Sequence, residues 1–153
     1  MEQREVSQDA VLTRIGQAVM LLHGGDREEA RNRFGELWAE IGESGDPLHR
    51  CTLAHYMADT QDDPGDELAW DLRALTAAEG PATACAAPAA VRAFYPSLHL
   101  NLAADYVKLQ RPDAARLHLS RARAAVNALG DDGYGNDGVR TAIGRLEREL
   151  LDE

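Results

Sequence analysis

His55 and Asp59 are the two residues whose types and spacing come nearest to a reactive site in this sequence. They stand four positions apart, so on a helix both side chains would lie on one face. An imidazole and a carboxylate in that arrangement can hold a metal ion, or the carboxylate can orient the imidazole. A histidine in an apolar stretch is more often a core residue, and we therefore expect His55 to be structural. A metal-dependent regulator centred on His55 and Asp59 remains an alternative.

Acidic side chains are concentrated immediately after this pair. The stretch from Asp59 to Asp71 contains no basic residue and six acids, namely Asp59, Asp62, Asp63, Asp66, Glu67 and Asp71. Asp63 is placed to cap a helix, and Asp66 and Glu67 would lie near the positive end of its dipole. These roles do not account for Asp59 or Asp71. Two interpretations therefore stand: an ordinary solvated helix start, or an exposed acidic patch that receives a basic partner.

The motifs that usually mark catalysis are absent from the sequence. It contains no His-Glu-x-x-His, no Cys-x-x-Cys and no Gly-x-Ser-x-Gly. Residues 133–138 do fit Gly-x-Gly-x-x-Gly, but they follow an expected helix and not a strand, so we expect a turn there and not a dinucleotide site. The sequence predicts a protein that is not an enzyme, with no catalytic residue, no metal ligand and no cofactor.

Charge is distributed unevenly along the 153 residues. The formal net charge is −10, and residues 1–80 carry all of it, with 17 acids against 7 bases. This balance argues against nucleic acid and anionic membrane surfaces as partners, and it permits a basic protein segment. No apolar run is long enough to span a membrane, and the N-terminus lacks the apolar region of a signal peptide. We therefore expect a cytoplasmic protein whose two cysteines, Cys51 and Cys85, are free thiols.

Apolar residues recur at helical spacing along almost the whole chain, which predicts an all-α fold in one domain over residues 1–153. Short turns between the helices imply antiparallel neighbours. Asp26 with Glu29 indicates a capping box, and Asp46–Pro47 and Asp63–Pro64 each indicate a cap followed by proline at the first helical position. Residues 80–95 could be a loop or a helical turn. The expected elements are helix pairs at about 8–44, 46–80 and 95–130, and a capping helix at about 137–152.

The third pair carries a recognisable motif, formed by Leu102, Ala103, Tyr106, Ala115, Leu119 and Ala122. Their spacing resembles the tetratricopeptide repeat, in which small residues let two helices approach and large ones fill the notch between them. The first pair resembles it through Ala18, Leu21, Ala30 and Phe34. The resemblance implies a right-handed α-α superhelix of about three antiparallel helix pairs plus a C-terminal capping helix. A compact helical bundle without repeats is the alternative.

In tetratricopeptide arrays the first helix of each pair lines a concave groove that receives an extended peptide or a helix. The resemblance implies a partner-binding groove here, lined by Leu12, Ile15, Val19, His23, Tyr56, Asp59, Asn101 and Lys108. Asn101 matches a position at which some members bind a peptide carboxylate or backbone. Ile15 and Leu100 stand where such carboxylate clamps use lysine, so a clamp of that kind is incomplete. The expected groove is apolar at its N-terminal end and acidic in the middle.

These observations predict a non-catalytic adaptor that binds a protein or peptide carrying a basic segment. Two alternatives remain from the sequence. The first is structural self-association as a homodimer, through the apolar stripe formed by Leu12, Ile15, Val19 and Leu22. The second is the metal-dependent regulator centred on His55 and Asp59.

Overall fold

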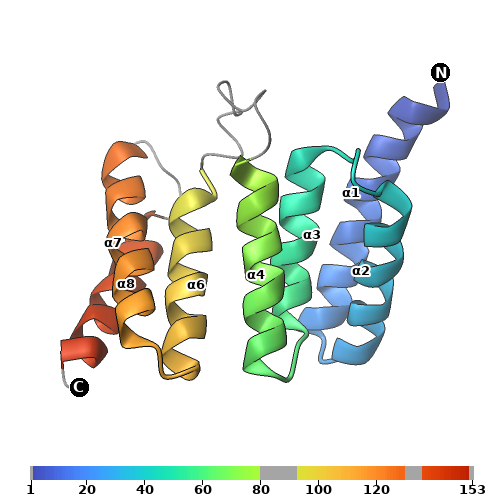
Figure 1. Cartoon of the computed structure of the whole chain (residues 1–153). Coiled ribbons are helices and arrows are strands. Elements are labelled where there is room, and N and C mark those ends of the chain that lie inside the picture. Colours follow the sequence, from blue (N-terminus) through green and yellow to red (C-terminus); the bar gives the residue numbers. More distant parts are fainter. Residues whose placement is uncertain (1, 80–92, 130–135, 152–153) are drawn as a thin grey trace.

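The computed structural model of the chain describes residues 2–79, 93–129 and 136–151 (Figure 1). Within these ranges the backbone forms helices and turns and no strand. The helices are α1 (Glu2–His23), α2 (Arg27–Ile41), α3 (Pro47–Asp59), α4 (Pro64–Glu79), α6 (Tyr95–Lys108), α7 (Pro112–Leu129) and α8 (Asn136–Leu151). The all-α class is therefore confirmed. Cys85, residues 80–92 of the open segment and residues 133–135 of the glycine-rich turn lie outside the described residues. Residues 136–138 begin α8, so the turn expected over 133–138 is wrong there.

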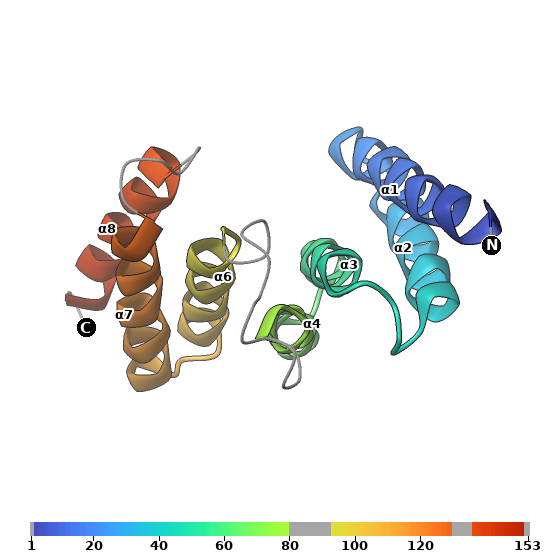
Figure 2. The ribbon, with the colours of Figure 1, turned by 90° about the horizontal axis from the view of Figure 1, so that it is seen from above.

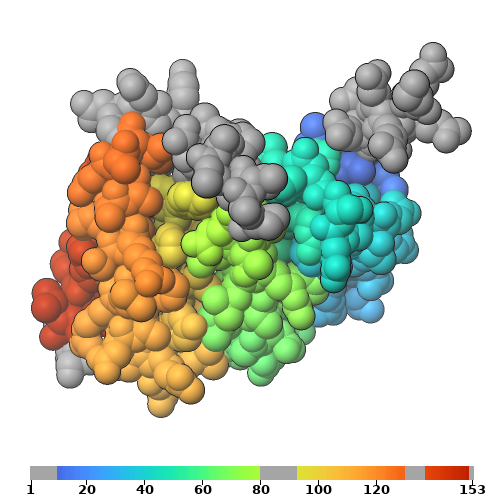
Figure 3. All heavy atoms as spheres, turned by 45° about the horizontal axis from the view of Figure 1, so that its top comes forward, coloured from blue at the N-terminus to red at the C-terminus, as the bar shows by residue number. Residues whose placement is uncertain are grey.

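The helices stand side by side in one row, with the two chain ends at opposite ends of it (Figure 1). Each described helix packs against the next one along the chain. Viewed from above, α1, α3 and α6 lie along one side of the row, and α2, α4 and α7 along the other (Figure 2). The described helices form one continuous surface from the first pair to the last (Figure 3). None of them combines the length and the apolarity that crossing a membrane requires.

The hydrophobic core consists of three clusters, each of which joins one helix pair to the next element. The first cluster contains Ile15, Ala18, Ala30, Phe34, Leu37, Leu53 and Met57. The second contains Cys51, Ala54, Ala74, Leu75, Ala78, Leu98 and Leu102. The third contains Ala103, Ala115, Leu119, Ala122, Val126, Ile143 and Leu150. Alanine recurs in all three clusters because a methyl side chain lets helix backbones approach closely.

Two tryptophans connect the first cluster to the second. Trp38 and Trp70 each pack against both clusters, and their rings meet edge to face with centroids 5.2 Å apart. Cys51 lies in the second cluster and is fully buried, and this burial raises the pKa of its thiol to about 12. The free, structural thiol expected at Cys51 is confirmed.

Two of the three helix starts expected from the sequence are confirmed. The side chain of Asp46 accepts a hydrogen bond from the backbone N–H of Leu48 at 2.8 Å, just before Pro47 begins α3. Asp63 accepts one from the backbone N–H of Asp66 at 3.0 Å, at the start of α4. In both turns a short acidic side chain satisfies a backbone donor that the helix itself leaves unpaired.

The capping box expected at Asp26 and Glu29 is wrong. Asp26 has φ −93° and ψ 65°, and its side chain makes no capping hydrogen bond. Hydrogen bonds at the end of α1 determine the conformation of this turn instead. The Asp26 N–H bonds the carbonyl of Leu21 at 2.9 Å, and the N–H of Gly25 bonds that of Leu22 at 3.2 Å. Gly25 has φ +94°, which this type of helix ending requires, and the turn is then too tight for Asp26 to adopt a capping conformation.

Candidate functional site

Three carboxylates from two helices meet inside the molecule, between α4 and α6. Glu67 and Asp71 lie one turn apart on α4, and Asp105 lies on α6. One oxygen from each carboxylate lies within 4.8 Å of those from the other two. Asp71 is 3% exposed and Asp105 is 1% exposed, while the side chain of Glu67 is 19% exposed. We call these three residues the carboxylate cluster.

Helix geometry and core packing place the carboxylate cluster. Asp71 follows Leu68 by three positions and precedes Leu75 by four, so it occupies a core-facing position in the apolar stripe of α4. Asp105 follows Leu102 by three positions and occupies the same kind of position on α6. Leu75 and Leu102 belong to the second core cluster, so the packing that joins α4 to α6 brings the two acids together.

Burial and mutual proximity dominate the electrostatics of this cluster. The pKa of Asp71 is raised far above its ordinary value, first by burial and then by the hydrogen bond to Asp105 and the charge of that residue. The pKa of Asp105 is also raised, again mainly by burial. One oxygen of each residue, Oδ1 of Asp71 and Oδ2 of Asp105, has no hydrogen-bond donor among the described residues. A buried acceptor without a donor costs about 1–3 kcal/mol, and more if it is charged.

A lysine partly balances the cluster. The Nζ of Lys108 donates a hydrogen bond to Oε1 of Glu67 at 2.8 Å. The negative charge of Glu67 and this hydrogen bond raise the pKa of Lys108. The side chain of Lys108 is 52% exposed, so the ion pair forms the solvent-facing rim of the cluster. One lysine cannot neutralise three carboxylates that are all ionised.

A histidine and an asparagine lie next to this rim. Nδ2 of Asn101 donates a hydrogen bond to Nδ1 of His55 at 3.1 Å, which links α6 to α3. Burial lowers the pKa of His55, and the nearby charge of Asp59 opposes that effect. His55 is half-buried and its ring nitrogen has a polar partner.

Asp59 is the exposed member of this neighbourhood. Although the residue is exposed as a whole, partial loss of water around its carboxylate raises its pKa, and the charge of Glu67 adds to the rise. His55, Lys108 and His23 act in the opposite direction.

The eight residues expected to line a groove differ from one another in burial and in the residues they contact. Lys108 bonds Glu67 of the carboxylate cluster, Asn101 bonds His55, and the charges of Lys108 and His23 lower the pKa of Asp59. Tyr56 is half-buried and stacks on Phe34, with ring centroids 5.8 Å apart.

The remaining three expected groove residues lie on α1. Leu12 is 52% exposed and Val19 is half-buried. Ile15 is only 5% exposed and belongs to the first core cluster, so it offers almost no surface to a partner. A partner that binds α1 would therefore contact Leu12 and its exposed neighbours, and not Ile15.

The acidic patch, one of the two interpretations of the stretch from Asp59 to Asp71, does not include Asp71. Asp71 is buried, because its position in the helical repeat faces the core. Asp62 pairs with Arg27 at 2.8 Å, and Glu67 pairs with Lys108. The acids of this stretch are thus divided between helix capping, ion pairs and the carboxylate cluster.

Sequence reasoning missed Asp105 altogether and gave Glu67 only a helix-start role. A signal was present, because both aspartates interrupt an apolar stripe at the spacing of core residues. An acid at such a position must be buried with a partner or rotated out to solvent. The four-residue spacing between Glu67 and Asp71 also places both on one face of α4.

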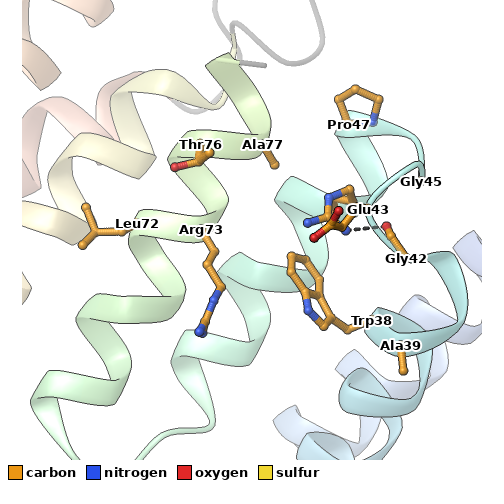
Figure 4. A pocket seen from close by; sticks show the side chains of 11 residues that line it. Trp38, Ala39, Gly42, Glu43, Gly45, Pro47, Leu72, Arg73, Thr76 and Ala77 are labelled. Atoms are coloured by element: carbon orange, nitrogen blue, oxygen red, sulfur yellow. Dashed lines mark hydrogen bonds between the residues drawn. The ribbon is translucent and has the colours of Figure 1, made fainter. Parts of the chain in front are cut away.

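A separate hollow of about 910 Å³ lies on the other side of the row, between α2 and α4. Trp38 and Arg73 line it from opposite sides (Figure 4). The guanidinium of Arg50 lies 4.2 Å from the centroid of Trp38 and donates a hydrogen bond to the carbonyl of Gly42. The guanidinium of Arg73 lies 4.4 Å from the centroid of Trp70. These cation–π contacts support the two tryptophans that join the core clusters.

Comparison with protein-family models, with curated proteins and with solved structures finds no significant match for this chain.

Proposed function

We propose that this protein is a non-catalytic adaptor that binds an extended protein segment carrying basic residues. In this proposal its helices form a tetratricopeptide-like right-handed superhelix of three antiparallel pairs, α1–α2, α3–α4 and α6–α7, with α8 as the capping helix. The partner lies along the face formed by α1, α3 and α6. That face consists of the first helix of each pair, which is the side that binds ligands in such arrays.

The observation that carries the proposal is that Asp59, Asn101 and Lys108 lie on helices of this face, where Asn101 also bonds His55, one turn before Asp59. They come from two successive first helices, and each can make a different contact with a peptide. Asn101 can bond a peptide backbone, Asp59 can attract lysine or arginine, and Lys108 can donate to a peptide carbonyl. The net charge of −10 adds long-range attraction for a basic segment.

Selection of peptides from a phage-displayed library of random sequences tests this proposal. We expect the selected peptides to be enriched in lysine and arginine, and to bind less tightly and with a weaker salt dependence to Asp59→Asn. Glu149→Gln is the matched control, because it makes the same charge change at an exposed residue of α8. Selected peptides without basic residues, or equal losses in the two variants, would contradict the proposal.

Self-association remains a second candidate, and two exposed residues on α1 favour it. Leu12 is 52% exposed and Met20 is 74% exposed. Size-exclusion chromatography with light scattering, over a range of protein concentrations, tests for a homodimer. The variant to use is Met20→Glu, because a charge at the buried Ile15 would damage the core whether or not a dimer forms. A concentration-independent monomer mass would exclude the dimer.

A further inference from the structure

The carboxylate cluster contains more negative charge than its protein neighbours balance. Three carboxylate oxygens converge from two helices, and Lys108 bonds only to the one from Glu67. Two ionised aspartates held this close in a buried place repel each other and lose the solvation of bulk water. A stable arrangement at neutral pH requires either retained protons or a cation.

The lack of a donor for the buried oxygens is an independent sign of a ligand. Asp71 and Asp105 are 3% and 1% exposed, and each has an oxygen with no donor among the described residues. Most buried polar atoms in proteins do have a partner. An oxygen that is buried and unpartnered inside a converging group of acids is suited to coordinate a cation.

The chemistry of the donors selects the class of cation. All three donors are carboxylate oxygens, the ligand type that Ca²⁺, Mg²⁺ and Mn²⁺ prefer over softer metals. Oxygens on opposite sides of a Ca²⁺ ion are separated by roughly 5 Å, since each Ca–O bond is about 2.3–2.6 Å. The limit of 4.8 Å between the cluster oxygens therefore fits three ligands around one ion. The partial exposure of Glu67 leaves room for water molecules to complete the coordination.

We propose that Glu67, Asp71 and Asp105 bind one divalent cation of the Ca²⁺, Mg²⁺ and Mn²⁺ class between α4 and α6. The ion is coordinated by the unpartnered oxygens of the two aspartates. Glu67 turns from Lys108 to the ion, and the lysine is released to solvent. The ion thereby joins the second helix pair to the third. This inference does not depend on the proposed adaptor function, since a metal clamp would stabilise the array whatever it binds.

Isothermal titration of the EDTA-treated and desalted full chain with CaCl₂, MgCl₂ and MnCl₂ tests the proposal. We expect one ion per chain, and a melting temperature that rises with the concentration of the bound ion. Asp105→Asn and Asp71→Asn should each weaken binding by roughly 100-fold or more, since losing a ligand costs at least as much as losing a residue that supports one. Asp66→Asn is the matched control, because it removes an exposed acid from the same helix.

The apo proteins provide a readout that separates ligand loss from misfolding. Replacing either aspartate by asparagine removes like-charge repulsion, so the variants should melt at or above the temperature of the metal-free parent and no longer respond to metal. If an aspartate variant does not fold, Glu67→Gln at the partly exposed ligand should still fold and bind the ion weakly. Absence of binding at millimolar metal, or equal weakening in Asp66→Asn, would overturn the proposal. The first result indicates proton sharing alone, and the second indicates diffuse binding to an acidic surface.

Discussion

Asn101 on α6 donates a hydrogen bond from Nδ2 to Nδ1 of His55 on α3, at 3.1 Å. The two residues are separated by 46 positions, and this bond connects the first helices of two successive pairs. It also requires that His55 carries its ring proton on Nε2 when neutral. The bond thus determines the tautomer of the neutral imidazole.

We expect Asn101→Ala to lower the free energy of unfolding by about 1–2 kcal/mol, because the half-buried His55 then loses its donor. Urea denaturation at pH 7 measures the loss. The control is the double variant that combines Asn101→Ala with His55→Phe, because phenylalanine has no ring nitrogen to leave without a partner. If the hydrogen bond is the cause, removing Asn101 should cost much less in the His55→Phe background than in the parent. Equal costs in both backgrounds would contradict this account.

The carboxylate cluster should make the metal-free protein less stable as the pH rises. Both aspartate pKa values are raised in the folded state, so the folded chain retains protons that the unfolded chain releases from about pH 4 upward. The stabilising contribution of these residues is therefore complete below about pH 4 and is lost with rising pH.

Asp71→Asn isolates this effect, because the amide can donate to Asp105 and does not titrate. We expect the variant to gain stability relative to the parent between pH 5 and pH 8, by about 1–3 kcal/mol, which is the cost of a buried acceptor without a donor. Urea denaturation in EDTA at both pH values measures the difference, with Asp66→Asn as the exposed control. A constant difference between variant and parent across this range would show that the cluster does not retain protons.

A buried pair of histidines should make the protein less stable as the pH falls, which is opposite to the effect of the carboxylate cluster. Nδ1 of His99 on α6 lies 3.1 Å from Nδ1 of His118 on α7, and Tyr106 stacks on His118 with centroids 5.5 Å apart. Burial, followed by the charges of His118 and Arg121, lowers the pKa of His99 to about 4. Burial also lowers the pKa of His118. The unfolded chain takes up these protons near pH 6.5, so acid favours unfolding.

We expect the parent to lose stability as the pH falls from 6.5 towards 4 because of these two histidines. His118→Phe keeps a ring stacked on Tyr106 but removes one titrating group. The loss between pH 7 and pH 5 should therefore be smaller in the variant, by about 1 kcal/mol, since one pKa unit corresponds to about 1.4 kcal/mol. Urea denaturation at the two pH values measures it. An unchanged pH dependence would show that the pair is protonated in the folded state as readily as in the unfolded chain.

The sequence predicts the helices well, because their starts and periodicity depend on nearby residues. Asp46 and Asp63 cap α3 and α4 as expected, through hydrogen bonds that span only a few positions. Asp26 shows the limit of that reasoning. Its local pattern is correct for a capping box, but the ending of α1 at Gly25 determines the backbone angles of the turn.

The candidate site was only partly predictable. The repeat resemblance predicts Asp59, Asn101 and Lys108 as groove residues, and in the structure Asn101 bonds His55 while Lys108 bonds Glu67. The carboxylate cluster depends on how α4 and α6 are rotated relative to each other, which no local pattern specifies. Ile15 illustrates the same difficulty, since an apolar residue on a first helix can face either the core or a partner.

Gln110 is strained at the end of α6, and relieving that strain should stabilise the protein. It has φ +59°, a conformation that costs a residue with a side chain about 1–2 kcal/mol. Hydrogen bonds maintain this conformation. The Arg111 N–H bonds the carbonyl of Tyr106 at 2.8 Å, and the Gln110 N–H bonds that of Val107 at 3.0 Å. Gly25 occupies the equivalent position at the end of α1, where glycine adopts a positive φ without penalty.

Gln110→Gly should therefore raise the free energy of unfolding by about 0.5–1 kcal/mol, since glycine loses part of the gain through the greater freedom of its unfolded chain. For a protein of this size the melting temperature should rise by about 1–4 °C. Gln110→Ala is the matched control, because it removes the same polar group but keeps the Cβ atom that causes the strain. Thermal unfolding followed by circular dichroism distinguishes the two variants. If alanine stabilises as much as glycine, the polar side chain and not the backbone conformation is the source of the cost.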